Sequence, residues 1–212
     1  MVLKIYGSKL ATCTRRVATV CHELQVPFEL VEVDIVNKEH KTPAYMEHQP
    51  FGQIPYIDDD GFILFETRAI CRYLAAKYPR NNLLPTDPKQ NALFEQAAAF
   101  EQANFDPAAS KVGLEFYKRR LGWGFDQQAV DANLPQLELR VPGYEAILGK
   151  TRYLAGDNIT LADIFHLPYG AFVAEGSDVL TKHPNIARWL NELTARPSWL
   201  AYTNGVVSTS AY

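Results

Sequence analysis

Residues 49–74 read QPFGQIPYIDDDGFILFETRAICRYL, and this stretch sets the architecture of the N-terminal part of the chain. Segments 55–57 and 62–65 have the composition of short strands, and the Asp-Gly pair at 60–61 between them is typical of a two-residue hairpin turn. From residue 66 onward, apolar side chains recur at helical spacing. The stretch therefore predicts a strand, a turn, a second strand and a helix.

The start of this helix carries Glu66 and Thr67, and it is suited to a ligand with two opposite charges. A helix entrance presents unpaired backbone N–H groups and the positive end of the helix dipole, so it favours a carboxylate near Thr67. The carboxylate of Glu66 favours an ammonium group. One short segment would therefore hold both ends of a free α-amino acid, although a Glu-Thr pair by itself is more often part of a capped surface helix.

Gln53, Ile54 and Pro55 lead into the first of these strands. A proline removes a donor from the sheet ladder, which is tolerated where a strand begins or lies at an edge. We expect the Ile54–Pro55 bond to be cis, which would turn the N–H and C=O of Ile54 outward. Such an exposed backbone pair can clasp an extended peptide in the way that a sheet edge does.

The thirty residues at 49–78, QPFGQIPYIDDDGFILFETRAICRYLAAKY, resemble the glutathione-binding half of the cytosolic glutathione transferases, in particular the phi class. The resemblance runs along nearly the whole chain, and this block is its most specific part. It implies a thioredoxin-like N-terminal domain, an all-helical C-terminal domain and a homodimer. It also implies that the partners are glutathione and a small apolar electrophile, with no cofactor besides the co-substrate.

The composition is compatible with this resemblance and argues against several other functions. The chain has 212 residues and a formal net charge of −3, so it lacks the positive charge expected of a protein that binds nucleic acid or an anionic membrane. No apolar run approaches membrane-spanning length, and the first residues lack a secretory signal. The three cysteines, Cys13, Cys21 and Cys71, have no metal-ligand spacing, and they favour a reduced cytoplasmic protein over a disulfide-bonded one.

The first 79 residues predict the order β-α-β-α-β-β-α. Strand patterns at 2–6 and 27–33 flank a helical pattern at 12–24, and a short irregular helix is expected at 41–46 before the stretch described above. This order is that of an α/β domain of the thioredoxin-like type with a cis-proline. Residues 80–88 are rich in Pro and Asn and predict a linker.

Residues 89–212 predict the all-helical domain that would contribute the electrophile pocket. A long helix is expected over 90–120, with a break at 106–107, and a second over 126–148 that starts anew near Pro142. Thr160 and Asp163 have the spacing of a capping box at the start of another helix, which favours a folding element over a catalytic one despite the nearby His166. Residues 206–212 have the composition of a tail.

Glutathione has two carboxylates, one ammonium group and one thiol, and the chain offers a candidate for each. Glu66 and Thr67 would bind the γ-glutamyl end, and the backbone of Ile54 would pair with the cysteinyl unit. The resemblance places His40 and Lys41 at the glycyl carboxylate, although these two residues alone are typical of a solvated loop. The side chain of Gln53 would add a hydrogen bond.

The thiol needs activation because the thiolate is the nucleophile. In phi-class enzymes a serine at the start of the first helix, five residues before an arginine, stabilises it. Segment 10–17 reads LATCTRRV, so counting back from Arg16 places Ala11 at the serine position. We expect Ala11 to lie in the glutathione site and Thr12 or Cys13 to supply the missing donor, with Ser8 or backbone N–H groups as alternatives.

Two rival functions follow from that departure. The first is a glutathione-dependent thiol transferase or reductase with Cys13 as nucleophile, and the second is a non-catalytic ligand-binding protein of the same fold. For the electrophile, an apolar pocket would be lined by Leu10, Ala11, Phe105, Phe116 and Tyr117, although aromatic residues at helical spacing are more often core. Glutathione peroxidase activity is a further possibility within the transferase hypothesis.

Overall fold

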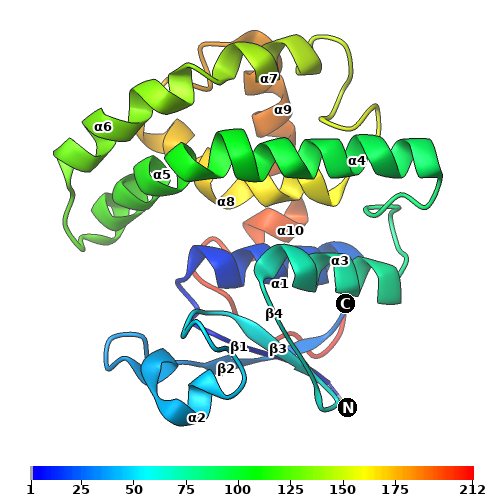
Figure 1. Ribbon diagram of the computed structural model, residues 1–212, viewed down its shortest axis with the longest axis vertical. Coiled ribbons are helices and arrows are strands. Elements are labelled where there is room, and N and C mark those ends of the chain that lie inside the picture. Colours follow the sequence, from blue (N-terminus) through cyan, green and yellow to red (C-terminus); the bar gives the residue numbers. More distant parts are fainter. Residues whose placement is uncertain (1) are drawn as a thin grey trace. The chain divides into compact units, whose positions relative to one another are not determined.

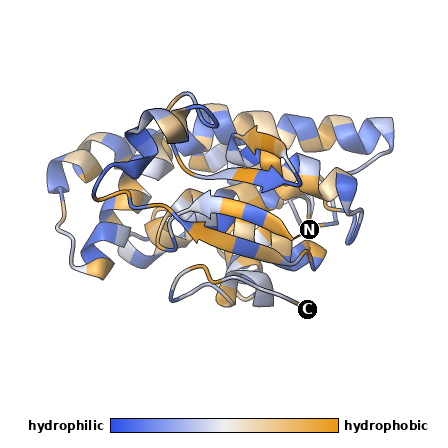
Figure 2. Cartoon of the chain, turned by 90° about the horizontal axis from the view of Figure 1, so that it is seen from below, coloured by the Kyte–Doolittle hydropathy of each residue, from blue (hydrophilic) through white to orange (hydrophobic). Residues whose placement is uncertain are grey.

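A computed structural model describes residues 2–212 and has a four-stranded mixed sheet in the order β2-β1-β3-β4 (Figure 1). The central strand β1 pairs in parallel with β2 and antiparallel with β3, which in turn pairs with β4. The strands are β1 (Leu3–Gly7), β2 (Phe28–Glu32), β3 (Tyr56–Asp59) and β4 (Phe62–Phe65). Apolar and polar residues alternate along several strands, as the orange and blue bands in Figure 2 show, which suits a sheet with one face buried.

The turn between β3 and β4 follows the prediction from its Asp-Gly pair. Asp60 and Gly61 have φ angles of 59° and 87°, and positive φ at both positions is what a two-residue type I′ hairpin requires. The Asp58 carboxylate accepts a hydrogen bond of 2.7 Å from the backbone N–H of Gly61. Local turn chemistry therefore sets the register of this hairpin.

The remaining elements of the first unit confirm the predicted order β-α-β-α-β-β-α. Helix α1 follows β1, a short 3-10 segment η1 and helix α2 follow β2, and helix α3 follows β4; their bounds are α1 (Thr12–Leu24), η1 (Glu39–Lys41), α2 (Pro43–Met46) and α3 (Thr67–Lys77). The Thr42 hydroxyl accepts a hydrogen bond from the Tyr45 N–H and caps α2. The thioredoxin-like topology thus follows from local sequence signals.

The C-terminal segment belongs to this first unit, which differs from the expectation that residues 89–212 form one helical domain. The chain divides into one unit of Met1–Leu83 with Pro197–Tyr212 and another of Leu84–Arg196. Helix α10 (Pro197–Leu200) packs on α1, where the Arg15 guanidinium lies 3.3 Å from the centre of the Trp199 ring. The predicted tail pairs with β2, because the N–H and C=O of Thr209 and Phe28 exchange hydrogen bonds of 2.9 Å. Covering this outer strand satisfies backbone groups that would otherwise be exposed.

The second unit is all-helical, as predicted, and α8 is its most buried helix. The helices are α4 (Pro88–Phe100), the π-helical turn η2 (Glu101–Phe105), α5 (Asp106–Leu121), α6 (Gln127–Glu138), α7 (Val141–Leu148), α8 (Leu161–Gly176) and α9 (Pro184–Thr194). At the predicted break at 106–107 the chain stays helical, and only the helix type changes, because the π-helical turn ends at Phe105 and α5 begins at Asp106. The predicted restart near Pro142 is confirmed by the start of α7.

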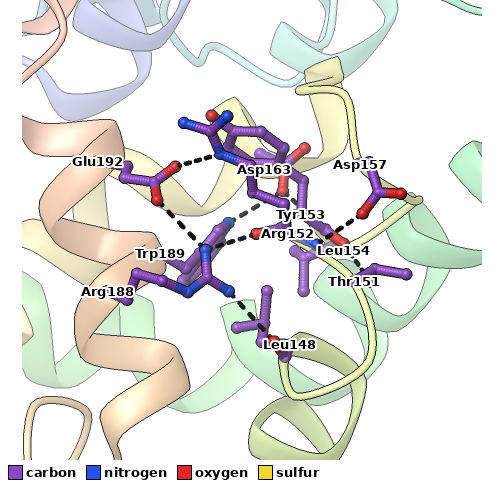
Figure 3. Close-up of polar contacts among 10 residues, drawn as sticks. All are labelled: Leu148, Thr151, Arg152, Tyr153, Leu154, Asp157, Asp163, Arg188, Trp189 and Glu192. Carbon is purple, nitrogen blue, oxygen red and sulfur yellow. Dashed lines mark hydrogen bonds and ion pairs between the residues drawn. The ribbon is translucent and has the colours of Figure 1, made fainter.

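The capping box at the start of α8 is present and is larger than the sequence indicated. The Asp163 carboxylate accepts hydrogen bonds from the N–H and hydroxyl of Thr160 at 2.9 and 3.1 Å. It also accepts from the Leu154 N–H and the Trp189 indole (Figure 3). Asp163 is fully buried, and this burial raises the pKa of its carboxyl, although the four hydrogen bonds oppose the shift. The interpretation as a folding element is confirmed, because these contacts join α8, α9 and the loop before α8.

The loop before α8 is also fixed to α9 by charged side chains (Figure 3). The Arg188 guanidinium donates to the carbonyls of Leu148 and Arg152 and to the carboxylate of Glu192, which also binds Arg152. Nearby, His166 is fully buried and donates through Nδ1 to the Ala162 carbonyl. Among residues 2–212 no helix is long and apolar enough to cross a membrane.

Candidate active site

The strand registers bring the predicted glutathione-binding segments to one end of the sheet. Tyr6 of β1 lies opposite Tyr56 of β3, and Tyr56 lies opposite Phe65 of β4. The loop after β1, the approach to β3 and the start of α3 therefore emerge side by side. Glu32 joins them at the end of β2, because it lies opposite Gly7 in the parallel pair.

The start of α1 offers backbone donors. Ala11 is the N-cap residue, with extended φ and ψ of −77° and 132°, and its methyl side chain makes no cap hydrogen bond. The first turn of the helix thus lacks the side-chain acceptor that a serine or aspartate would supply. A thiolate placed near Ala11 would face the N–H groups and the positive dipole end of a 13-residue helix.

The three candidate side-chain donors differ in their availability. Thr12 is 9% exposed, and its hydroxyl lies 4.0 Å from the sulfur of the partly exposed Cys13. The Ser8 hydroxyl donates to the Glu32 carboxylate at 2.9 Å. Ser8 would have to break this bond to donate to a thiol, and Thr12 would likewise have to release the Cys13 sulfur.

The loop that carries these residues is held from two sides by residues that the sequence patterns did not identify. The Glu32 carboxylate accepts the Lys9 N–H at 3.0 and 3.2 Å, and the Lys9 carbonyl accepts the Val206 N–H at 2.9 Å. An acidic residue at the end of a predicted strand was a usable signal for Glu32. No local pattern pointed to Val206, because its partner lies almost at the other end of the chain.

The predicted cis peptide bond between Ile54 and Pro55 is confirmed. Within residues 2–212 neither the N–H nor the C=O of Ile54 forms a hydrogen bond. The segment lies against the start of α1: a Cβ atom at Gly7 would be 2.5 Å from the Thr14 hydroxyl and 3.2 Å from Pro55 Cβ. Ile54 thus has an unused backbone donor and acceptor close to the end of β1.

Glu66 and Thr67 lie at the start of α3 in an unusual geometry. Glu66 has a φ of 69°, which is uncommon for a residue other than glycine, and such strain often accompanies binding sites. Its exposed carboxylate has no hydrogen bond or ion pair within the described residues. Thr67 is buried, and its hydroxyl accepts a hydrogen bond of 3.2 Å from Arg16, which is 2% exposed. Arg16 therefore supports the start of α3. The sequence alone did not indicate this role, because there Arg16 served only to locate Ala11 by counting.

His40 and Lys41 lie in η1 against the loop that precedes Gln53. Gly52 has a φ of 58°, and a Cβ atom there would come within 2.8 Å of the His40 carbonyl and of the Lys41 side chain. The Lys41 ammonium donates to the Phe51 carbonyl at 3.2 Å, while the buried Nδ1 of His40 has no partner within residues 2–212. Gln53 is exposed, and the pair thus lies next to the segment that carries Gln53 and Ile54.

Comparisons with known proteins agree with this geometry. Residues 1–76 match the model of the glutathione S-transferase N-terminal domain, and residues 105–197 match that of the C-terminal domain. This chain belongs to the glutathione S-transferase family. It is an enzyme that conjugates glutathione. Its relatives are likewise named glutathione S-transferases.

Individual relatives support the phi class for this transferase. Glutathione S-transferase PM239X14 of Arabidopsis thaliana is 43% identical over 196 residues, which are 89% of this chain and 90% of the relative. Glutathione transferase F7 of Populus trichocarpa has a TM-score of 0.89 at 35% identity, over 96% of this chain and 98% of the other. Glutathione S-transferase I of maize, solved with an atrazine glutathione conjugate, has a TM-score of 0.85 at 31% identity, over 95% and 96% of the two chains.

The residues predicted to contact the electrophile lie in both units of the transferase. Leu10 is partly buried in the first unit, next to Gly205. In the helical unit Phe105, Phe116 and Tyr117 are at most 9% exposed, and their rings pack on His166, Phe125 and Phe172 respectively. These contacts make the three aromatic residues part of the core of that unit, and their role toward a substrate stays a prediction.

The cysteines of the transferase differ in their exposure. Cys21 and Cys71 are fully buried, and burial raises the pKa of both thiols, that of Cys71 to about 12. Both thiols are therefore protonated at neutral pH and shielded from ligands. Cys13 is the one cysteine of the chain that is partly exposed, so a thiol-transfer reaction would depend on it.

Proposed function

We propose that this transferase binds glutathione at the sheet end formed by β1, β3 and β4, and that it activates the thiol without the usual serine. The carrying observation is the convergence of three features there. They are the start of α1, whose N-cap residue Ala11 makes no side-chain cap hydrogen bond, and the backbone of Ile54 and the carboxylate of Glu66, both unpaired within residues 2–212. Each is complementary to a different part of the tripeptide. Unsatisfied polar groups that converge on one place are typical of a binding site.

Each charged group of glutathione has a proposed partner. The Glu66 carboxylate binds the ammonium of the γ-glutamyl unit, and the N–H groups at Thr67 bind its carboxylate. Ile54 pairs its backbone with the cysteinyl unit as an added strand does. The glycyl end is bound by His40, Lys41 and Gln53. Gly52 supports this assignment, because it packs closely against the His40 carbonyl and the Lys41 side chain.

The chemistry requires the thiol to lose its proton before it reacts. We propose that the Thr12 hydroxyl and the first-turn N–H groups of α1, beside Ala11, stabilise the thiolate and thereby lower the thiol pKa. The proton leaves to solvent, the sulfur forms a bond to an electrophilic carbon, and a leaving group departs with the electrons of its own bond. In this reaction Cys13 forms no covalent intermediate.

The second substrate in this proposal is a small apolar electrophile. Support comes from the maize relative, whose structure contains an atrazine glutathione conjugate, an aromatic product. Leu10, Phe105, Phe116 and Tyr117 remain the proposed contacts to the electrophile. A homodimer in the cytoplasm is part of the same proposal, in keeping with the family and with three free cysteines.

A rival function has one specific observation in its favour. Cys13 is partly exposed and lies in the first turn of a helix, where a bound glutathione sulfur could reach it. Such a cysteine would make the protein a thiol transferase that forms a mixed disulfide with glutathione.

Capture on immobilised glutathione followed by three assays tests the proposal. The purified protein is assayed with an aryl halide, a hydroperoxide and a glutathione mixed disulfide. We expect turnover of the aryl halide and no covalent adduct in intact-protein mass spectrometry. Turnover of the disulfide alone, with a glutathione adduct on Cys13, would replace the proposal with the rival. Retention on the resin without any turnover would indicate a ligand carrier.

A further inference from the structure

The C-terminal segment of the first unit contacts α1 near both of its ends. The Ser198 hydroxyl donates to the Glu23 carboxylate near the end of α1, and the Arg15 guanidinium near its start donates to the Trp199 carbonyl at 3.0 Å. Both contacts are buried, and α10, which carries Ser198 and Trp199, lies beside α1 in Figure 1. The chain is therefore already close to the start of α1 when it reaches residues 205–209, which we call the C-terminal strap.

The C-terminal strap is attached to the rest of the first unit at two points. At its first end the Val206 N–H donates to the Lys9 carbonyl at 2.9 Å. At its second end Thr209 exchanges two backbone hydrogen bonds with β2, and the Leu30 N–H donates to the Ser208 hydroxyl oxygen at 2.9 Å. The second attachment covers the edge of the sheet, whereas the first reaches the loop next to the proposed thiol site.

The loop held by the strap is a tight turn over residues 8–11. The N–H of Ala11 donates to the carbonyl of Ser8 at 3.0 Å, which closes the turn. Its second residue, Lys9, donates through its N–H to the Glu32 carboxylate and accepts through its C=O from the strap. Within residues 2–212 the Lys9 carbonyl has no other hydrogen-bond donor. Both backbone groups of Lys9 are thus fixed by residues from distant parts of the chain.

This turn determines where α1 begins. Ala11 is the N-cap residue, and its carbonyl accepts a helical hydrogen bond of 3.0 Å from the Arg15 N–H. A capping side chain would fix the entry to the helix locally, but Ala11 supplies none. The positions of the first-turn N–H groups and of the Thr12 hydroxyl therefore depend on the turn, and the turn depends on Glu32 and on the strap.

The close approach of the strap to the turn requires a glycine at position 205. Gly205 has a φ of 113°, and a Cβ atom there would lie 3.3 Å from the Lys9 carbonyl oxygen and 3.5 Å from the Leu10 side chain. The next residue, Val206, is 1% exposed, while Val207 is 62% exposed. The strap is therefore anchored at residues 205–206 by a close backbone fit and by a buried side chain.

We propose that the C-terminal strap, through Gly205 and Val206, positions the turn at 8–11 and thereby the groups at the start of α1 that stabilise the glutathione thiolate. This inference rests on the proposed function, because it takes the glutathione sulfur to lie at the start of α1. Without the strap the Lys9 carbonyl loses its donor, and the N–H groups and the Thr12 hydroxyl are held less firmly toward the sulfur. Since Gly205 and Val206 act through the turn, they are positioning residues.

Val206→Pro tests the proposal because it removes the N–H that holds Lys9. Ultraviolet titration of bound glutathione should show a thiol pKa higher by about one unit, and kcat with an aryl halide at neutral pH should fall about three- to tenfold. The affinity for glutathione should change by less than about twofold. Val206→Ala keeps the N–H and loses only packing, and Val207→Pro removes an N–H that has no partner in the described part of the chain. Both control variants should keep the wild-type thiol pKa.

The pH dependence of the rate separates positioning of the thiolate site from a general loss of structure. Well above the thiol pKa, Val206→Pro and the wild-type protein should reach the same rate, because the thiol then loses its proton without help. A damaged fold would lower the rate at every pH. A parallel loss across the whole pH range, with the thiol pKa unchanged, would overturn the proposal.

Gly205→Ala is a second variant, which keeps every N–H and places a methyl group against the Lys9 carbonyl. Its matched control is Gly124→Ala, because Gly124 has a φ of 102° and a Cβ atom there would meet no other atom within 4 Å. Both variants carry backbone strain, but only Gly205→Ala should raise the thiol pKa. Equal effects of the two substitutions would mean that strain alone matters, and would overturn the role of Gly205.

Hydrogen exchange followed by mass spectrometry examines the turn without any substrate. Amides of residues 8–13 should exchange faster in Val206→Pro than in Val206→Ala or Val207→Pro, in variants that circular dichroism shows to be folded. Unchanged exchange in a folded Val206→Pro variant would overturn the proposal. A wild-type protein without a bound thiolate would overturn the proposed function and this inference with it, whereas a wild-type thiolate that Val206→Pro leaves unchanged would overturn this inference alone.

Discussion

The Arg16 guanidinium donates through Nη1 to the Thr67 hydroxyl over 3.2 Å, and both side chains are buried. This bond joins the first helix to the start of α3, two elements whose residues are 51 positions apart in the sequence. It therefore fixes the proposed thiol-binding end of α1 relative to the proposed binding site for the γ-glutamyl unit.

Thr67→Val should destabilise the protein because it removes this acceptor from a buried cation while preserving shape. A hydrogen bond to a charged group contributes about 1.5–3 kcal/mol, and we expect a loss of that size in the free energy of unfolding. Urea denaturation followed by circular dichroism gives the value. Thr67→Ser retains the hydroxyl and serves as the control; equal losses in both variants would mean that the methyl group, and not the bond, matters.

Glu66→Gln should weaken glutathione binding by about tenfold or more, because the ammonium of the ligand loses its charged partner. Isothermal titration calorimetry measures the affinity. Glu29→Gln removes a carboxylate from an exposed position of β2 and should have no effect. Unchanged affinity in Glu66→Gln would remove this residue from the site.

Thr12→Val should raise the pKa of the bound glutathione thiol and slow conjugation at neutral pH, with little change in affinity. The loss of one such donor costs at most several kcal/mol of transition-state stabilisation. Ultraviolet titration of the bound thiolate and rates with an aryl halide measure the two effects.

Two companion variants make the thiol test decisive. Cys13→Ser should leave both the pKa and the rate unchanged, whereas loss of disulfide exchange in this variant would support Cys13 as nucleophile. Ala11→Ser should raise the rate if Ala11 occupies the position of the serine. If neither Thr12→Val nor Cys13→Ser has any effect, backbone donation or Ser8 remains.

Glu32→Gln should loosen the loop after β1, because its carboxylate accepts from both the Ser8 hydroxyl and the Lys9 N–H. We expect a higher thiol pKa in the complex and a lower kcat, with the free energy of unfolding reduced by about 1 kcal/mol. Glu29→Gln on the same strand is again the control. A change in stability with the thiol pKa unaltered would assign Glu32 a purely structural role.

Asp163→Ala should destabilise the helical unit more than an ordinary cap does. Loss of a cap costs about 1 kcal/mol, but Asp163 is fully buried and also accepts from Leu154 and Trp189, so we expect about 3 kcal/mol or more. Thermal and urea unfolding measure the loss, and glutathione affinity of the folded fraction should hardly change. A stable variant with collapsed turnover would instead assign Asp163 to catalysis.

The amino-acid sequence by itself determined the elements and their order. The Asp-Gly pair at 60–61, the period of apolar residues after Glu66 and the spacing of Thr160 and Asp163 are local signals, and each acts through backbone geometry within a few residues. The cis bond at Pro55 and the change of helix type before α5 lie at prolines, whose backbone is special. The departure at Ala11 was also visible in the sequence, because it depends only on counting from Arg16.

Only the tertiary structure decided which residues hold these elements together. Glu32 supports the loop after β1, Arg16 reaches Thr67, and the segment that begins at Pro197 returns to α1 and β2. These contacts join residues far apart in the chain, where no periodicity or turn preference acts, so packing and burial alone select the partners. The cavity lined by Phe100, Gly143 and Ile147 has the same origin, since a cavity is a property of two helix faces together.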